Sequence, residues 1–157
     1  MKKEGAVLSA RIESELEDIL VLIDRIKTAW RKAKDTNDDF YLDSVALNLL
    51  GLYSGLERIF EKIASIIDGS VPSGVNWHQE LLNQMAVEVP HIRPAVISID
   101  LKDNREEYRG FRHVVRNVYT YRLDPEKLKP LVRNINKVWK KIDNELSAFA
   151  KFLQIAE

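Results

Sequence analysis

Apolar residues recur three and four positions apart along most of the chain, and this spacing predicts α-helices. In the first such stretch the apolar positions are Ile12, Leu16, Ile19, Ile23, Ile26 and Trp30. Charged residues fill the positions between them, which gives a helix of about five or six turns one apolar face. The second stretch repeats the pattern with Val45, Leu49, Leu52, Leu56, Ile59, Ile63 and Ile66. The polar segment 35–39 is short, so these helices are expected to form an antiparallel hairpin, with its last residues capping the second helix.

Glycine and proline in the segment 69–74 interrupt this pattern. Asn76 followed by Gln79 resembles a capping box, and it predicts a short helix from Trp77 to about Ala86. Prolines at positions 90 and 94 make the next stretch irregular. A fourth helix is then expected from about Ile97 to Val118.

A fifth helix is expected to begin at Asp124-Pro125, because Asp is a favourable N-cap and Pro a favourable first helical residue. Pro130 predicts a kink in this helix or a delayed start. The apolar positions farther on are again three and four apart: Ile135, Val138, Ile142, Leu146, Phe149 and Leu153.

These patterns predict an all-α protein, an up-and-down bundle of four to five helices forming one domain over residues 1–157. No segment alternates with period two for long enough to predict a strand. The absence of cysteine excludes disulfides and thiolate chemistry. No apolar run approaches the ~18–20 residues that a membrane span needs, and no signal peptide is visible, so no membrane association and a cytoplasmic location are expected.

Positive charge is concentrated in one segment of the chain. Lysine and arginine number 24, aspartate and glutamate also 24, so the chain has no overall positive charge for a polyanion. Between Asn104 and Arg122, however, there are five arginines, no lysine and two acidic residues. On a helix, four of these arginines fall within one stripe about 60° wide. They are Arg105, Arg109, Arg112 and Arg116, and together they are called the arginine stripe below.

The arginine stripe requires a compensating negative charge. Like charges four residues apart on a helix are mildly unfavourable. Acidic residues of other helices, such as Glu57 or Glu61, a partner protein or a phosphate chain are the alternatives. On the opposite side of the same helix, Phe111, Val114, Val115 and Val118 form an apolar face, and Tyr108 and Tyr119 border the stripe. Arginine in place of lysine favours planar, bidentate binding of phosphate or carboxylate.

The histidines do not predict a metal site. His78 and His91 are isolated in the sequence, without a second imidazole or a carboxylate at the usual spacing of metal ligands. No cofactor is expected.

The segment Phe111-Arg112-His113-Val114-Val115-Arg116-Asn117-Val118-Tyr119 resembles the active-site helix of HEPN-domain proteins, in particular the HepT-like toxins of bacterial toxin–antitoxin pairs. Their motif is an arginine, often followed by a polar residue, then a histidine after four to six residues and a nearby tyrosine. Arg112, His113 and Tyr119 match the arginine, the polar residue and the tyrosine. The segments 53–60, Trp77-His78, 109–111 and 123–125 also resemble this family.

The resemblance implies a metal-independent endoribonuclease that promotes attack of a ribose 2′-hydroxyl on the adjacent phosphate. Arg112 would bind and polarise the phosphate, and Arg105, Arg109 and Arg116 would hold RNA phosphates nearby. Asn117 stands where the motif has histidine. Because asparagine cannot transfer a proton at neutral pH, His113 is the alternative base, with Asn117 positioning the 2′-hydroxyl. The catalytic candidates are therefore Arg112, His113 and Asn117.

The resemblance also implies partners. The family is expected to form homodimers, to act on RNA, and to be neutralised by a nucleotidyltransferase antitoxin. In this family such an antitoxin can transfer AMP to the tyrosine of the motif, here Tyr119. AMP would place a negative charge beside Arg112 and Arg116. Two further hypotheses remain: a catalytically inactive helical subunit that binds a nucleotidyltransferase partner or a nucleotide, and a helical scaffold whose arginine stripe is neutralised internally.

Overall fold

The computed structural model describes residues 2–116 and 123–156, without the side chains of Lys2, Arg105, Glu106, His113, Val114 and Arg116. Its helices are α1 (Lys2–Thr36), α2 (Phe40–Ile63), α3 (Trp77–Met85), α4 (Ile99–Arg116), α5 (Pro125–Arg133) and α6 (Ile135–Ile155). The last turn after α2 is a π-helix, η1 (Ala64–Asp68). The described residues contain no β-strand, so the all-α prediction is confirmed.

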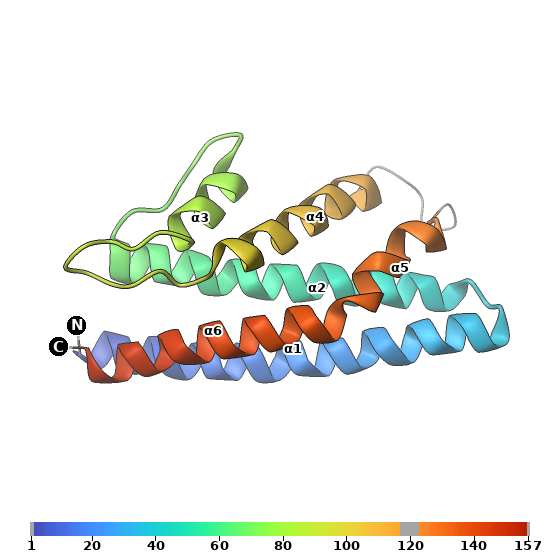
Figure 1. The fold of residues 1–157 in the computed structure, drawn as a ribbon, viewed down its shortest axis with the longest axis horizontal. Coiled ribbons are helices and arrows are strands. Elements are labelled where there is room, and N and C mark those ends of the chain that lie inside the picture. Colours follow the sequence, from blue (N-terminus) through green and yellow to red (C-terminus); the bar gives the residue numbers. More distant parts are fainter. Residues whose placement is uncertain (1, 117–122, 157) are drawn as a thin grey trace.

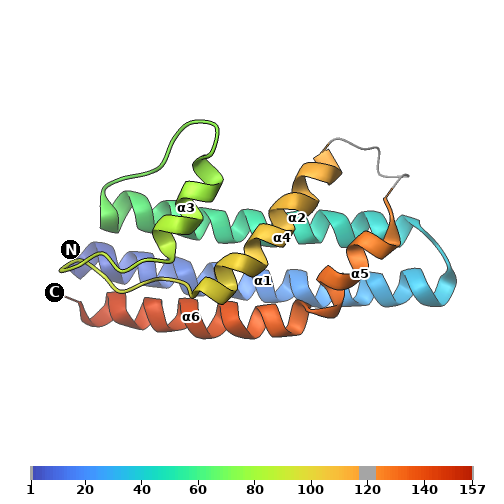
Figure 2. The ribbon, with the colours of Figure 1, turned by 45° about the horizontal axis from the view of Figure 1, so that its top comes forward.

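Three long helices, α1, α2 and α6, lie side by side along the length of the molecule, and the two termini meet at one end (Figure 1). The shorter helices α3 and α4 lie on the side of α2 away from α1, where they run in opposite directions (Figures 1 and 2). Along the chain, α1, α2, α4 and α6 alternate in direction, as predicted for an up-and-down bundle.

Helix α1 packs closely against both of its long neighbours. Four residues of its apolar face, Ile12, Ile19, Ile23 and Ile26, are at most 1% exposed. The buried Ser9 hydroxyl donates to the carbonyl of Ala150 on α6 at 2.9 Å. At Gly5 a Cβ would lie 2.8 Å from the carbonyl oxygen of Leu153, so only glycine permits this close approach of α1 to α6.

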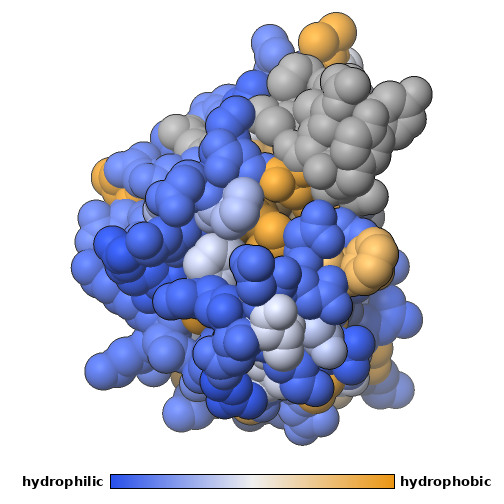
Figure 3. Space-filling model, turned by 90° about the vertical axis from the view of Figure 1, so that its right-hand side faces the viewer, coloured by the Kyte–Doolittle hydropathy of each residue, from blue (hydrophilic) through white to orange (hydrophobic). Residues whose placement is uncertain are grey.

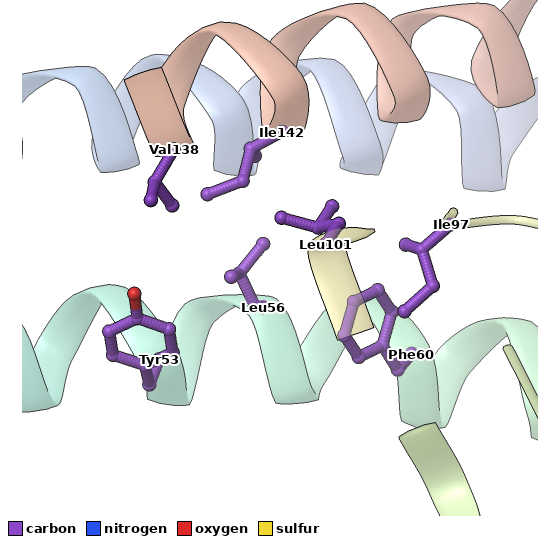
Figure 4. A pocket seen from close by; sticks show the side chains of 7 residues that line it. All are labelled: Tyr53, Leu56, Phe60, Ile97, Leu101, Val138 and Ile142. Atoms are coloured by element: carbon purple, nitrogen blue, oxygen red, sulfur yellow. The ribbon is translucent and has the colours of Figure 1, made fainter. Parts of the chain in front are cut away.

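Helix α4 docks through Leu101 and Tyr108, which are 3% and 2% exposed. At its start Ser98 is the N-cap, with Oγ accepting from the backbone N–H of Leu101 at 3.1 Å, and Glu145 of α6 accepts from the Ser98 N–H. Figure 4 shows the apolar junction of α2, α4 and α6 around a cavity of about 10 Å³. Its lining residues are Tyr53, Leu56, Phe60, Ile97, Leu101, Val138 and Ile142.

The structure confirms the predicted cap of α5 but not the capping box of α3. Asp124 accepts from the Glu126 N–H at 2.9 Å and Pro125 follows it, as predicted. At α2 the N-cap residue Asp39 makes no side-chain cap, and Asp38 accepts from the Phe40 N–H instead. The capping box at α3 was wrong, because the Asn76 side chain makes no cap hydrogen bond.

The fifth predicted helix is divided in two, which raises the number of α-helices among the described residues to six. Pro130 lies inside α5 and has no N–H to donate to the preceding turn. The chain leaves helical geometry four residues later at Asn134, whose φ and ψ are −91° and 0°, and α6 then begins. Figure 1 shows α5 at an angle to α6.

A buried ion pair fixes the irregular segment between α3 and α4. Arg93, with 0% of its side chain exposed, donates from Nε and NH2 to the two oxygens of Asp68 at 2.6 and 2.8 Å. Its guanidinium also donates to the carbonyls of Gln84, Val87 and Pro94. Asp68 ends η1, and Gly69 follows in the left-handed region at φ 69°. One arginine thereby joins η1, the end of α3 and the segment leading to α4.

Tyr108 is the basis of a prediction about alkaline stability. Burial raises its pKa from 10.0 to about 12, the charge of Glu107 adds to the shift, and a hydrogen bond with Tyr53 opposes it. Between pH 10 and 12 the unfolded chain loses this proton while the folded protein keeps it, so the free energy of unfolding falls by about 2 to 3 kcal/mol as pH rises. Urea titrations across this interval are expected to show a smaller fall for Tyr108→Phe. An equal fall in both proteins would contradict the prediction.

The surface exposes scattered hydrophobic side chains. At the end of the bundle that carries the α1–α2 turn, the visible face is mainly hydrophilic with small separate hydrophobic spots (Figure 3). The most exposed large hydrophobic residues among those described are Val75, Ile155, Phe40, Leu47 and Ile99. Within the described ranges no helix has the length and apolar character needed to cross a membrane.

Candidate functional site

The face of α4 that packs against the core carries Leu101 and Tyr108. On the helix this face lies between the arginine stripe and the apolar face that was predicted opposite to the stripe. Tyr108 is fully buried, its ring lies over Tyr53 of α2 with the centroids 3.6 Å apart, and its hydroxyl donates to the carbonyl of Leu131 at 3.3 Å. Phe111 and Val115 are half-buried. Arg112 is one turn beyond Tyr108 and therefore lies on the edge of the stripe nearest to the core.

Arg112 forms an ion pair within the chain. Its NH1 donates to Oε1 of Glu57 at 2.8 Å, and the two side chains are only 19% and 11% exposed. Glu57 lies one turn beyond Tyr53 on α2, and Arg112 lies one turn beyond Tyr108 on α4. The two contacts between these helices are therefore one turn apart. The Tyr53–Tyr108 stack and the Glu57–Arg112 pair thus fix the rotation of α4 about its axis.

The same oxygen of Glu57 contacts a histidine. His78, in the first turn of α3, places Nδ1 3.1 Å from Glu57 Oε1, and its side chain is 29% exposed. The His78 ring also lies against Trp77, with centroids 3.5 Å apart and planes inclined by 32°. Three helices therefore contribute to one cluster, Glu57, His78 and Arg112, which is called the Glu57 cluster below.

Arg109 contacts the first turn of α3. Its NH1 donates to the side-chain oxygen of Gln79 at 2.5 Å, and the residue is exposed. Gln79, predicted to close a capping box, instead joins α3 to α4. Gln79 is neutral, so this contact does not compensate the positive charge of Arg109.

Arg112 and Arg109 are the site residues from the sequence whose side chains the structure describes. The side chains of Arg105, His113 and Arg116 lie outside the described part, although their backbones are in α4. Asn117, Tyr119 and Arg122 lie outside the described residues altogether. The roles assigned to all of these residues stay predictions.

The Glu57 cluster places a cation, a carboxylate and an imidazole where α2, α3 and α4 meet. The pairing with Glu57 confirms that an acidic residue of another helix compensates part of the stripe. Arginine has five N–H donors in a planar fork, and a single carboxylate oxygen at NH1 engages only one side of it. The arrangement can therefore hold Arg112 in a fixed orientation, with the imidazole of His78 on the same carboxylate oxygen.

Sequence reasoning missed His78 as part of this cluster. The signal was weak, because Glu57, His78 and Arg112 are 21 and 34 residues apart in sequence and only the packing of three helices joins them. Among the described residues, no group of three or more His, Asp or Glu side chains is placed to hold a metal ion.

Comparison with known proteins identifies the family. Residues 44–153 match the family model described as HepT-like protein, a range that includes α2 after its first turn, α3, α4, α5 and nearly all of α6. No curated protein and no solved structure matches the chain significantly. The matched range contains Glu57, His78 and Arg112. Because the match covers well over half of the 157 residues, this chain belongs to the HepT-like protein family.

Proposed function

We propose that this protein is a metal-independent endoribonuclease and the toxin of a pair neutralised by a nucleotidyltransferase. The observation that carries the proposal is the position of Arg112. In a member of the HepT-like family, the arginine that matches the active-site motif is held by Glu57 at the edge of a cluster that also contains an imidazole.

The proposed chemistry follows from the guanidinium. Arg112 binds the phosphate next to the attacked bond and stabilises the charge that grows on its oxygens. Arg109, exposed one turn earlier, contacts a flanking phosphate, and Arg105 and Arg116 extend the arginine stripe along α4. We further propose a homodimer, in which two arginine stripes would face a shared RNA.

The experiment is an RNA cleavage assay with the purified chain, expressed without any partner, on mixed cellular RNA in the presence of a chelator. Arg112→Ala, purified in the same way, is the control for contaminating nucleases. We expect cleavage by the natural protein and none by the variant. Equal RNA patterns in both samples would overturn the proposed function.

The second candidate function is a catalytically inactive subunit that binds a nucleotidyltransferase partner or a nucleotide. It is favoured by Asn117, which replaces the histidine of the motif, and by the Glu57–Arg112 pair, which neutralises part of the stripe without RNA. Asn117→His separates the two functions in the same assay. Cleavage by Asn117→His alone, with an inactive natural protein, would establish the binding subunit.

The proposed partnership includes modification of Tyr119. Transfer of AMP to its hydroxyl would add a negative charge to the end of the arginine stripe, where it would compete with RNA phosphate. This modification would act as the off switch of the toxin in the proposed pair.

A further inference from the structure

We infer that His78 is the residue that takes the proton from the ribose 2′-hydroxyl, and that Glu57 is its positioning residue. This inference rests on the proposed function and assigns the proton transfer that Asn117 cannot perform. It replaces His113 as the expected base with a histidine from another helix.

His78 lies close to Arg112. Both His78 Nδ1 and Arg112 NH1 contact Oε1 of Glu57, at 3.1 and 2.8 Å. Because they share one atom, these two nitrogens lie no more than about 6 Å apart, and the His78 ring therefore lies beside the Arg112 guanidinium. A phosphate held by Arg112 would therefore bring the adjacent ribose within reach of the His78 ring.

Glu57 also selects the tautomer of the His78 ring. A carboxylate facing Nδ1 favours the neutral imidazole that carries its proton on Nδ1, which donates to Oε1. Nε2 is then the basic nitrogen, and the carboxylate stabilises the imidazolium that forms when Nε2 accepts a proton. The Glu57 side chain is 11% exposed, so this interaction is only weakly screened by water.

Two neighbours fix the orientation of the His78 ring. The ring of His78 is held on one side by Glu57 and on its face by Trp77, which is itself half-buried against the core. Its side chain is nevertheless 29% exposed, more than that of Glu57 or Arg112. His78 is thus fixed at its Nδ1 edge and reaches solvent, as a base that meets a large substrate must.

The step assigned to His78 is the transesterification of RNA. Nε2 accepts the proton of the 2′-hydroxyl while the 2′-oxygen forms a bond to phosphorus. The bond from phosphorus to the 5′-oxygen of the next nucleotide breaks, and that oxygen takes a proton from water. The products are a 2′,3′-cyclic phosphate and a 5′-hydroxyl, and the imidazolium returns its proton to solvent.

The test uses two variants of His78 in the full chain. His78→Asn keeps an N–H donor near the position of Nδ1, so the contact with Glu57 is preserved while the base is removed; His78→Gln keeps a polar atom near Nε2. His91→Gln is the matched control, and His113→Gln tests the competing assignment of the base, because the chain has three histidines in all. Melting temperatures of all four variants establish that each is folded.

We expect both His78 variants to cleave an RNA oligonucleotide at least about a hundredfold more slowly than the natural protein, as removal of a general base does. The rise of the cleavage rate with pH near neutrality is expected to disappear in the His78 variants. The same rise is expected to shift to another pH in Glu57→Gln, and the His91→Gln control is expected to keep it.

The outcomes separate the two proposals. Cleavage at the natural rate by His78→Asn and His78→Gln would overturn the inference, while the loss of cleavage in Arg112→Ala would still support the proposed function. A loss in His113→Gln in place of the His78 variants would return the role to His113. No cleavage by the natural protein itself would overturn the proposed function, and the reaction step assigned to His78 with it.

Discussion

Replacing Arg93 with alanine is expected to lower the free energy of unfolding by about 3 to 5 kcal/mol, the cost of removing one partner of a buried ion pair. Asp68, whose side chain is 6% exposed, would keep a buried charge without its bidentate partner. The carbonyls of Gln84, Val87 and Pro94 would lose the donors that Arg93 provides. Against the total stability of an average domain, about 5 to 15 kcal/mol, this loss brings the protein close to unfolding at room temperature.

Arg58 offers a matched control for this experiment. It pairs with Glu15 at 2.7 Å, a distance close to that of the Arg93 pair, but its side chain is 60% exposed. Arg58→Ala is expected to cost less than about 1 kcal/mol, because water screens the exposed pair. Urea denaturation of both variants measures the difference. Similar losses in the two would show that the burial of Arg93 contributes little.

Replacing Arg112 with lysine is expected to reduce RNA cleavage roughly a hundredfold to a thousandfold, the range seen when one donor to a developing oxyanion is removed. Lysine keeps the positive charge and can still pair with Glu57. It lacks the planar fork, however, so it cannot contact Glu57 and a phosphate in fixed directions at the same time. If charge alone mattered, the variant would keep most of the activity.

Arg109→Lys is the control for this substitution. Arg109 lies one turn from Arg112 on the same helix, is exposed, and contacts the neutral Gln79 in place of a carboxylate. It is expected to change cleavage only a few-fold and mainly through weaker binding, since it is proposed to hold a flanking phosphate. Rates measured at saturating and at limiting RNA separate binding from the chemical step. Equal effects of the two lysine variants on the saturated rate would contradict the role given to Arg112.

The helices were predicted well because their apolar spacing is long and regular. The positions from Ile12 to Ile26 and from Ile135 to Leu153 are buried in the structure as their three- and four-residue spacing indicated. The helix caps were predicted in part: Asp38, one of the last residues of the segment 35–39, accepts from the Phe40 N–H as expected, but Gln79 contacts Arg109 and does not form a capping box. In this case a side chain had more than one partner within reach, and tertiary packing decided between them.

The candidate site was predictable only in part. The spacing of four arginines identified one helix face, and the neutralising role considered for Glu57 was confirmed by its contact with Arg112. The participation of His78 was not predictable, because it depends on where a nine-residue helix lies against α2 after an irregular connection. Local patterns specify which face of a helix is polar, but not which residues of other helices meet it.

The packing of α1 against α6 has a consequence for how the protein folds. These helices belong to the first and last parts of the chain, yet they are joined by the Ser9–Ala150 hydrogen bond and the close approach at Gly5. Contacts between distant parts of a sequence form late, because a long loop must close first. During synthesis the α1–α2 hairpin can form early, but the side of α1 that α6 covers stays uncovered until α6 has been made. The time between the synthesis of the first and last helices therefore sets how long this apolar surface is exposed to other chains.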